Sequence, residues 1–422
     1  MAVTNVAPPR EFLCPGEKIP VTRAVHLARL AAAYPACGRC PFREGSPDRP
    51  QGDSAATRLC RTEGFRGVYL NELGDDFAGR LGAALAALLW NESDGAAGSG
   101  RSERERPVVV AFDDRPWSAR LAVLAGEALR RSGCATIDVG MATGPQFRHA
   151  VALLEAAAGV IATGAGGGPA LAGFDLALAG GRPLSAGGTL ERLFGQVESN
   201  VGRMTRIGGP CRSYDAAAAY HELLTHHLAC EPAIPAIVGT ASPLLRNLLS
   251  RFSGRGLRTI DLPRRAASEQ GETDDLDRIA KLVRSDGTVF GFWIDEEGSR
   301  CRAVDETGTA LSGAGLARLL LTDLLEANPA SPVAVDWTLG ERLAGNVLRR
   351  REVVRSNGTS EAMFLSVRDH AAVAGADSAG RFWLSQPTVG SDALLALGRL
   401  RRLLADGDEP LSQRVRSIGS AG

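Results

Sequence analysis

The sequence is poor in aromatic residues and carries no excess of either charge. Among 422 residues, Phe, Trp and Tyr make up 5%, and 48 Lys and Arg balance 48 Asp and Glu. A chain without net charge is not a general binder of polyanions, so we do not expect nucleic acid as a partner. Apolar residues make up 44% of the chain, enough for real hydrophobic cores, which must be built mainly from Ala, Leu and Val.

Long apolar runs are also missing. A helix needs roughly 18 to 20 mostly apolar residues to cross a bilayer, and no such stretch occurs. The N-terminus lacks the basic start and apolar stretch of a secretory signal. We therefore expect no membrane partner and, by default, a cytoplasmic location.

The eight cysteines are unevenly distributed, with four in the first 60 residues: Cys14, Cys37, Cys40 and Cys60. In a reducing compartment, clustered cysteines indicate a metal site more often than disulfides. The pair at 37 and 40 has the C-x2-C spacing of a zinc knuckle, which makes Zn²⁺ one prediction. An iron–sulfur cluster on the same thiolates and no metal at all are the alternatives, because Cys14 and Cys60 are isolated.

Short β-type runs alternate with helical patterns from residue 64 onward, which is typical of parallel βαβ units. We predict strands at 108–112, 136–139, 159–163, 235–239, 259–262, 289–294, 332–336 and 352–355. We predict helices at 22–33, 75–90, 118–132, 146–157, 243–252, 275–284, 339–349 and 392–405. Polar, glycine-containing stretches at 198–210 and 304–312 are candidate boundaries. The expected division is a Cys-bearing segment at 1–60, then domains at 61–204, 205–304 and 305–422.

Several short motifs follow one another along the chain. They are 62–67 (TEGFRG), 108–118 (VVVAFDDRPWS), 137–145 (IDVGMATGP), 180–185 (GGRPLS) and the region 294–311. In sequence and in order they resemble motifs of the α-D-phosphohexomutases, the phosphoglucomutase and phosphomannomutase family, over roughly residues 62–405.

The resemblance implies an α/β fold of three tandem α/β/α domains with mixed sheets, preceded here by the small Cys-bearing N-terminal segment. Family members have a fourth, smaller domain with a phosphate-binding loop, and we expect this domain to be absent. They interconvert 1- and 6-phosphosugars in carbohydrate metabolism. A phosphoserine transfers the phosphoryl group, and a Mg²⁺ held by three aspartates neutralises charge.

The family's active-site loop, T-A-S-H-N-P-P-E-Y-N-G-F-K, matches residues 163–175 (TGAGGGPALAGFD) without gaps. The nucleophilic serine falls on Ala165, and a methyl group cannot carry a phosphoryl group. The family's lysine falls on Asp175. Arg66 and Arg115 match positions that face the catalytic cleft in the family. Without a ligand, Arg115 would pair with a local carboxylate such as that of Asp113 or Asp114.

The family's metal loop, D-G-D-x-D-R, matches residues 295–300 (DEEGSR). Asp295 is retained, and Glu297 could still ligate a metal through its longer side chain. Ser299 cannot supply the third carboxylate charge that a hard cation prefers. The resemblance implies Mg²⁺, but we expect weak binding or none.

The family's sugar-hydroxyl motif, G-E-x-S-G-H, matches residues 376–381 (ADSAGR). Gly380 is identical, Asp377 could replace the glutamate as a hydroxyl acceptor, and Arg381 stands at the histidine position. These three residues are the predicted substrate-binding group.

The nucleophile, the metal loop, the hydroxyl motif and the phosphate clamp are thus all altered. We predict a catalytically inactive phosphohexomutase-like protein that binds a sugar phosphate or regulates a protein partner. One alternative is a metal-stabilised N-terminal interaction module carried on a mutase-like scaffold. Another is a residual enzyme with altered chemistry on phosphosugars.

Overall fold

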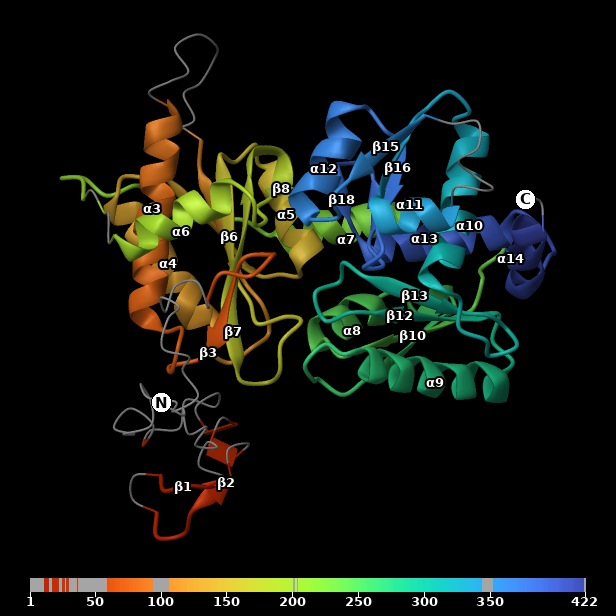
Figure 1. Cartoon of the computed structure of the whole chain (residues 1–422), viewed down its shortest axis with the longest axis horizontal. Helices are drawn as coiled ribbons and strands as arrows, with labels where there is room; N and C mark the ends of the chain where they lie inside the picture. The colour runs from red at the N-terminus through yellow and green to blue at the C-terminus, as the bar shows by residue number, and fades with distance from the viewer. Residues whose placement is uncertain are drawn as a thin grey trace, which may run out of the picture.

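The computed structural model describes residues 11–14, 17–22, 25–26, 28–29, 36, 59–93, 106–199, 202, 204–343 and 352–420 (Figure 1). Most of the helix expected at 22–33 lies outside these residues, as do Cys37 and Cys40. Near the N-terminus, β1 (Glu11–Phe12) and β2 (Val21–Thr22) form an antiparallel pair. No helix in the described ranges is both long and apolar enough to cross a membrane.

The first sheet has the strand order β3-β7-β6-β4-β5-β9, with β8 paired to β7. Its strands are β3 (Phe65–Val68), β4 (Val108–Phe112), β5 (Thr136–Met141), β6 (Ala158–Ala162), β7 (Leu171–Leu178), β8 (Arg182–Pro183) and β9 (Cys211–Ser213). Its helices are α3 (Asp75–Ser93), α4 (Ser118–Arg131), α5 (Gly144–Leu153) and α6 (Thr189–Glu198). Strands β6, β4, β5 and β9 are parallel, while β3, β7 and β8 are antiparallel. Helices cover both faces, so β6 is buried along its whole length.

The second and third sheets repeat this plan, with parallel strands flanked by antiparallel ones. The second has the order β11-β10-β12-β13, and the third has the order β15-β14-β16-β17-β18. The strands of the second sheet are β10 (Ala236–Thr240), β11 (Leu257–Asp261), β12 (Phe290–Ile294) and β13 (Cys301–Val304). The helices of this unit are α7 (Ala216–His227), α8 (Pro243–Ser250) and α9 (Glu269–Asp286). The strands of the third sheet are β14 (Val333–Asp336), β15 (Val353–Ser356), β16 (Ala374–Ala376), β17 (Phe382–Leu384) and β18 (Gly390–Ser391). The helices of this unit are α10 (Gly313–Ala327), α11 (Trp337–Leu343), α12 (Ser360–Asp369), α13 (Ala393–Ala405) and α14 (Leu411–Ser420).

The α/β fold with three mixed sheets is confirmed, and we call the units built on these sheets the first, second and third domains. Strand β9 lies beyond residue 204 and pairs with β5, so the first sheet extends to Ser213. The domain limits expected from the sequence stay predictions.

Local capping explains where helix α5, which borders the candidate site, begins. The helix expected at 146–157 is α5, which starts at Gly144 and ends at Leu153. Thr143 accepts a hydrogen bond from the backbone N–H of Gln146, and Gln146 accepts one from Thr143 in return. This capping box, with Pro145 in the first turn, begins the helix two residues earlier than its apolar pattern indicates.

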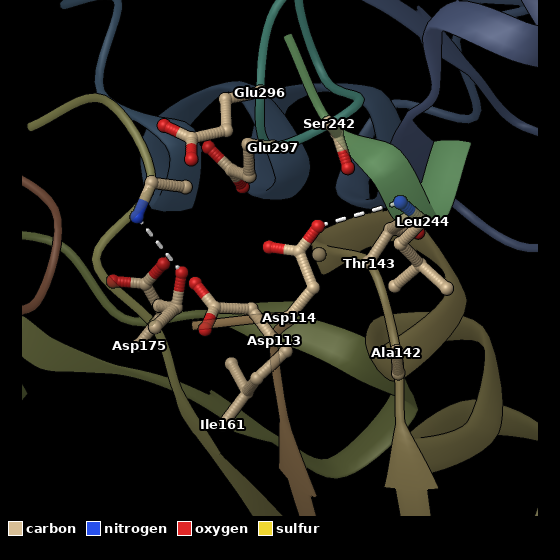
Figure 2. A pocket seen from close by; sticks show the side chains of 13 residues that line it. Asp113, Asp114, Ala142, Thr143, Ile161, Asp175, Ser242, Leu244, Glu296 and Glu297 are labelled. Atoms are coloured by element: carbon tan, nitrogen blue, oxygen red, sulfur yellow. Dashed lines mark hydrogen bonds between the residues drawn. The ribbon is translucent and has the colours of Figure 1, made fainter. Parts of the chain in front are cut away.

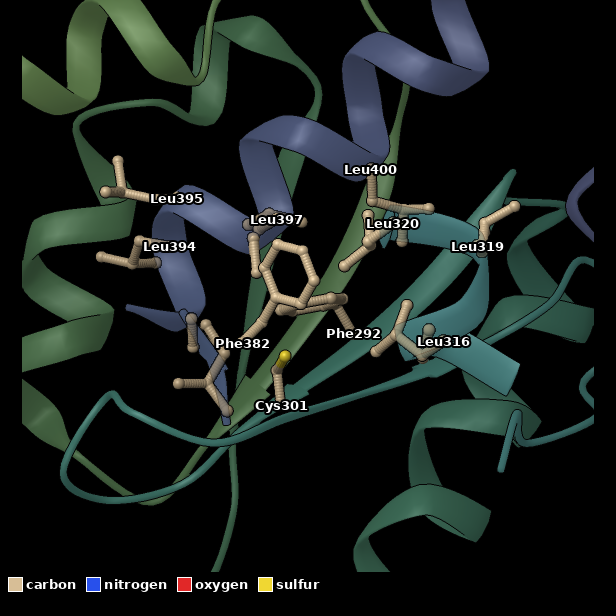
Figure 3. Close-up of a cluster of buried hydrophobic side chains, with 14 of the residues drawn as sticks. Phe292, Cys301, Leu316, Leu319, Leu320, Phe382, Leu394, Leu395, Leu397 and Leu400 are labelled. Atoms are coloured by element: carbon tan, nitrogen blue, oxygen red, sulfur yellow. The ribbon is translucent and has the colours of Figure 1, made fainter. Parts of the chain in front are cut away.

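The second and third domains share one hydrophobic core, shown in part in Figure 3. Phe292 and Cys301 reach it from the second sheet, Phe382 from the third sheet, Leu320 from α10 and Leu397 from α13. The expected boundary at 304 and 305 therefore separates two sheets but divides a single core.

Candidate functional site

A pocket lies between the first and second domains, where the parallel strands of both sheets end. Its empty volume is about 350 Å³. Five carboxylates line it and face the same space in Figure 2: Asp113, Asp114, Asp175, Glu296 and Glu297. Open α/β sheets collect polar side chains at the carboxyl ends of their strands, which accounts for this position.

Ala165, at the position of the predicted nucleophile, lines this pocket. Its backbone N–H donates to Thr163 Oγ1 at 3.0 Å, and its carbonyl accepts from Arg66 Nε at 3.3 Å. The neighbouring Gly164 N–H donates to Asp113 Oδ2 at 2.9 Å. The loop keeps its shape through these bonds, but the side chain that it presents is a methyl group.

The Ser118 hydroxyl, which shares the Asp113 carboxylate with this loop, is also engaged, since it donates to Asp113 Oδ1 at 2.5 Å. The pocket's own hydroxyls belong to Thr143, Thr163 and Ser242. Each accepts a backbone N–H: from Gln146 at 3.3 Å, from Ala165 at 3.0 Å and from Leu245 at 3.3 Å, respectively. These hydroxyls stabilise turns and helix starts.

Two predicted cleft residues, Arg66 and Arg115, form ion pairs with carboxylates, Arg66 through two nitrogens and Arg115 through one. Arg66 Nη1 and Nη2 lie 2.6 and 2.9 Å from the carboxylate oxygens of Asp175. Arg115 Nη2 lies 2.9 and 2.8 Å from those of Glu296, in the second domain. Arg115 Nε is also 3.6 Å from Asp113, so the expected local pair exists beside a stronger pair between domains.

Arg264 adds a second cation to this part of the pocket. Its Nη2 lies 2.6 Å from Asp114 Oδ1, and its Nε lies 2.5 Å from Glu296 Oε1. Burial raises the pKa of Glu296 above its ordinary value, and the attraction of Arg115 and Arg264 does not fully offset that effect.

The metal-loop residues Asp295, Glu297 and Ser299 lie close together, but one carboxylate oxygen of Asp295, one of Glu297 and the Ser299 hydroxyl already have partners. Asp295 Oδ1 accepts the backbone N–H groups of residues 298, 299 and 300 at 2.9, 2.9 and 3.0 Å. Glu297 Oε1 accepts from Arg148 Nη1 at 3.1 Å and from Ser299 Oγ at 3.1 Å. Arg148 Nη2 donates to Ser299 Oγ at 2.9 Å. Oxygens that already accept hydrogen bonds from a guanidinium do not fit Mg²⁺, which requires several free oxygen ligands in octahedral geometry.

The predicted sugar-hydroxyl residues form a closed cluster in the third domain. Asp377 is fully buried, and its oxygens accept from the Arg381 backbone N–H at 3.1 Å, Arg381 Nε at 2.7 Å and Trp383 Nε1 at 3.0 Å. Gly380 has φ of 87°, and its carbonyl accepts from the backbone N–H of Cys301 at 3.0 Å. The role of Asp377 as a hydroxyl acceptor stays a prediction, since a sugar would have to compete for these donors.

Comparisons with known proteins decide the family. The first α/β/α domain of phosphoglucomutase/phosphomannomutase matches residues 57–191. A phosphoglucosamine mutase from Frankia alni is 26% identical over 387 residues, covering 86% of this chain and 82% of its own. A phosphoglucomutase/phosphomannomutase from Thermococcus kodakarensis is 23% identical over 379 residues, covering 86% and 80%. The chain is a distant homologue of the α-D-phosphohexomutase superfamily, similar to its members over about 86% of its length.

Solved structures support the same fold. A phosphoglucomutase/phosphomannomutase family protein from Burkholderia thailandensis superposes with a TM-score of 0.73 at 20% identity, covering 86% of this chain and 80% of that one. A putative phosphomannomutase from Thermus thermophilus gives 0.68 at 19% identity, covering 86% and 84%. The phosphohexomutase fold therefore extends through all three sheets.

The cysteine prediction is only partly within the described residues of this phosphohexomutase homologue. Cys14 Sγ is buried 3.9 Å from His26 Nδ1, and half-buried Cys60 lies 3.9 Å from the Arg61 carbonyl. Among the described side chains, no group of three or more His, Cys, Asp or Glu is placed to hold a metal ion. Zinc at this cluster stays a prediction.

Two site residues, Arg148 and Arg264, were not predicted from the sequence. Both follow the carboxyl end of a parallel strand, Arg148 after β5 and Arg264 after β11. Cations at such positions are a usable signal, because this edge of the fold collects polar side chains.

Proposed function

We propose that this protein is a phosphohexomutase homologue that does not transfer phosphate. We propose that it acts instead as a regulatory protein that binds a protein partner. The observation that carries the proposal is Ala165, whose methyl group lines the pocket where the family's serine would attack. A covalent phosphoryl intermediate needs an oxygen nucleophile, and neighbouring groups cannot supply one by better positioning.

The charge of the pocket supports the proposal. Its five carboxylates face the space that a phosphosugar would enter, and three of them, Asp175, Glu296 and Asp114, are paired with Arg66, Arg115 and Arg264 respectively. A phosphate group brings up to about two negative charges near neutral pH. Two like charges about 4 Å apart repel by roughly 4 kcal/mol at a protein-like dielectric. A phosphosugar would therefore have to displace carboxylates from the arginines before it could bind.

The oxygens of loop 295–300 that match the family's metal ligands also support the proposal. Glu297 and Ser299 contact Arg148, and Asp295 Oδ1 is bound to three backbone N–H groups. Because these residues do not fit Mg²⁺, we assign no step to a metal. A role through binding agrees with a scaffold whose loops are retained and whose reactive groups are replaced.

A mutase assay tests the proposal. Purified protein is incubated with glucose 1-phosphate, mannose 1-phosphate or glucosamine 1-phosphate, with Mg²⁺ and a bisphosphorylated hexose as activator. We expect no formation of the 6-phosphate, and the same result for Ala165→Ser, since the metal loop is altered too. Turnover that scales with protein and disappears in Ala165→Leu, which fills the pocket, would overturn the proposal. Comparing these variants separates turnover by this chain from that of a contaminant.

A further inference from the structure

The loop that holds Mg²⁺ in the family already contacts a cation here, the guanidinium of Arg148. This side chain is only 13% exposed. Its Nη1 lies 3.1 Å from Glu297 Oε1, and its Nη2 lies 2.9 Å from Ser299 Oγ. The same Nη2 donates to the carbonyl of Ser391 at 3.1 Å. One guanidinium from the first domain thus binds the second and the third.

We infer that Arg148 is an internal cation that takes the place of a divalent ion in loop 295–300 and joins the three domains. The inference goes beyond the proposed function and does not depend on it. Loss of the nucleophile concerns the first domain's loop at residue 165, whereas this replacement concerns the loop of the second domain.

The backbone around Arg148 is built for this contact. Helix α5 approaches loop 295–300 so closely that the Gly144 N–H donates to the Glu297 carbonyl at 3.3 Å. A Cβ at Gly144 would lie 2.7 Å from Glu297 Oε1, so only glycine permits this approach without a shift. Arg148 follows Gly144 by four residues and therefore lies on the same face of the helix, one turn further along.

Charge in the loop is balanced without a metal ion. Glu297 pairs with Arg148 at 3.1 Å. Asp295, besides its three backbone donors, lies 3.6 Å from Arg300 Nε. Each of the loop's two carboxylates that match family ligand positions thus lies within ion-pair distance of a guanidinium, and Arg300 also contacts Glu272 at 3.2 Å. A divalent ion would have to displace these contacts to gain its ligands.

The loop is also held from the side of the third domain. The Ala393 N–H, at the start of α13, donates to the Gly298 carbonyl at 2.9 Å. This contact and the bond from Arg148 to Ser391 reach neighbouring points of the third domain. The position that an exchangeable ion would fill is therefore occupied by a permanent contact between domains.

Thermal unfolding with and without divalent ions tests the inference. Melting temperatures are measured for the full chain, Arg148→Met and Arg131→Met, in EDTA and in MgCl₂ or MnCl₂ at constant ionic strength. Arg131 is a matched control because it lies on a helix of the same domain and is 65% exposed. We expect no divalent effect on the parent protein or on the control.

Arg148→Met leaves Glu297 without its cation, so we expect a fall in melting temperature on the order of 5 °C in EDTA. We also expect part of that loss to be restored by Mn²⁺. The added substitution Glu297→Gln should abolish this restoration, which separates loop binding from general ion effects. Arg148→Lys keeps a charge and should remain insensitive to divalent ions.

A saturable rise in the melting temperature of the parent protein with Mg²⁺ or Mn²⁺ would overturn the inference. So would an Arg148→Met variant as stable as Arg131→Met, or one that gains no response to Mn²⁺. If Arg148→Met does not fold, Mn²⁺ titration of the parent protein by electron paramagnetic resonance decides, since stoichiometric binding at the loop contradicts an internal cation and its absence supports one. Mutase turnover would overturn the proposed function instead and leave this inference standing.

Discussion

Arg381→Met is expected to destabilise the folded protein by about 3–5 kcal/mol, the usual cost of removing one partner of a buried ion pair. Arg381 Nε lies 2.7 Å from Asp377 Oδ2, and the Asp377 side chain is fully buried. Burial alone would lower the pKa of Arg381, but Asp377 and Glu63 raise it, so the side chain stays charged.

The size of the effect follows from what the substitution leaves behind. Asp377 would keep two neutral donors, the backbone N–H of residue 381 at 3.1 Å and Trp383 Nε1 at 3.0 Å, but no cation. The Gly358 carbonyl would lose its donor at 2.6 Å, and Glu63 of the first domain would lose a partner at 3.1 Å. These further losses place the expected value above the lower end of the range.

Urea unfolding followed by tryptophan fluorescence measures this cost, and Trp383 reports from beside the buried pair. Arg368→Met is the matched control, since Arg368 and its partner Asp369 are 47% and 51% exposed, and a surface pair contributes about 0–1 kcal/mol. The double variant Arg381→Met with Asp377→Asn should recover part of the loss. Unfolding of Arg381→Met at the same urea concentration as the control would show that the buried pair does not contribute this stability.

Three further predictions concern buried groups away from the pocket. Burial raises the pKa of Cys301 to about 12, so iodoacetamide near neutral pH should label exposed Cys211 and reach Cys301 only after denaturation, as peptide mass spectrometry would show. Phe292→Ala should lower the free energy of unfolding by about 3–5 kcal/mol, because it removes a large side chain from the core. Since the second and third domains share that core, hydrogen exchange should increase in both of them together. Increased exchange confined to the second domain would contradict this. Tyr220→Phe removes a donor 2.6 Å from Asp392, whose pKa burial raises, and should cost about 1–3 kcal/mol. That cost should be full above the raised pKa of Asp392 and should shrink as the pH falls through it, because protonation removes the charge that Tyr220 stabilises; melting curves against pH would show a constant difference if this is wrong.

Sequence periodicity located most of the parallel strands, for a clear physical reason. Strands covered on both faces must be almost wholly apolar, and β4 was predicted with its exact bounds, while β10 and β14 were each within one residue. Short or exposed elements carry no such signal. Strand β9 is exposed at all three residues, and only its pairing with β5 makes it a strand.

The candidate site shows the same division between local and distant information. The loop around Ala165 could be located from the sequence because residues 163–175 match the family's active-site motif without gaps. The partner of Arg148 could not, because Glu297 lies 149 residues away and the contact depends on how two domains dock. A pairing of this kind follows from tertiary packing, which no local pattern encodes.

Covalent phosphorylation is the most direct test of the claim that this phosphohexomutase homologue has lost phosphoryl transfer. The folded protein is incubated with a hexose bisphosphate labelled with ³²P, beside a catalytically active family member, and both are examined after denaturation and by peptide mass spectrometry. We expect labelled serine in the active relative and no phosphate attached to this chain. Stoichiometric phosphate on any residue lining the pocket, for example the Ser242 hydroxyl, would contradict it.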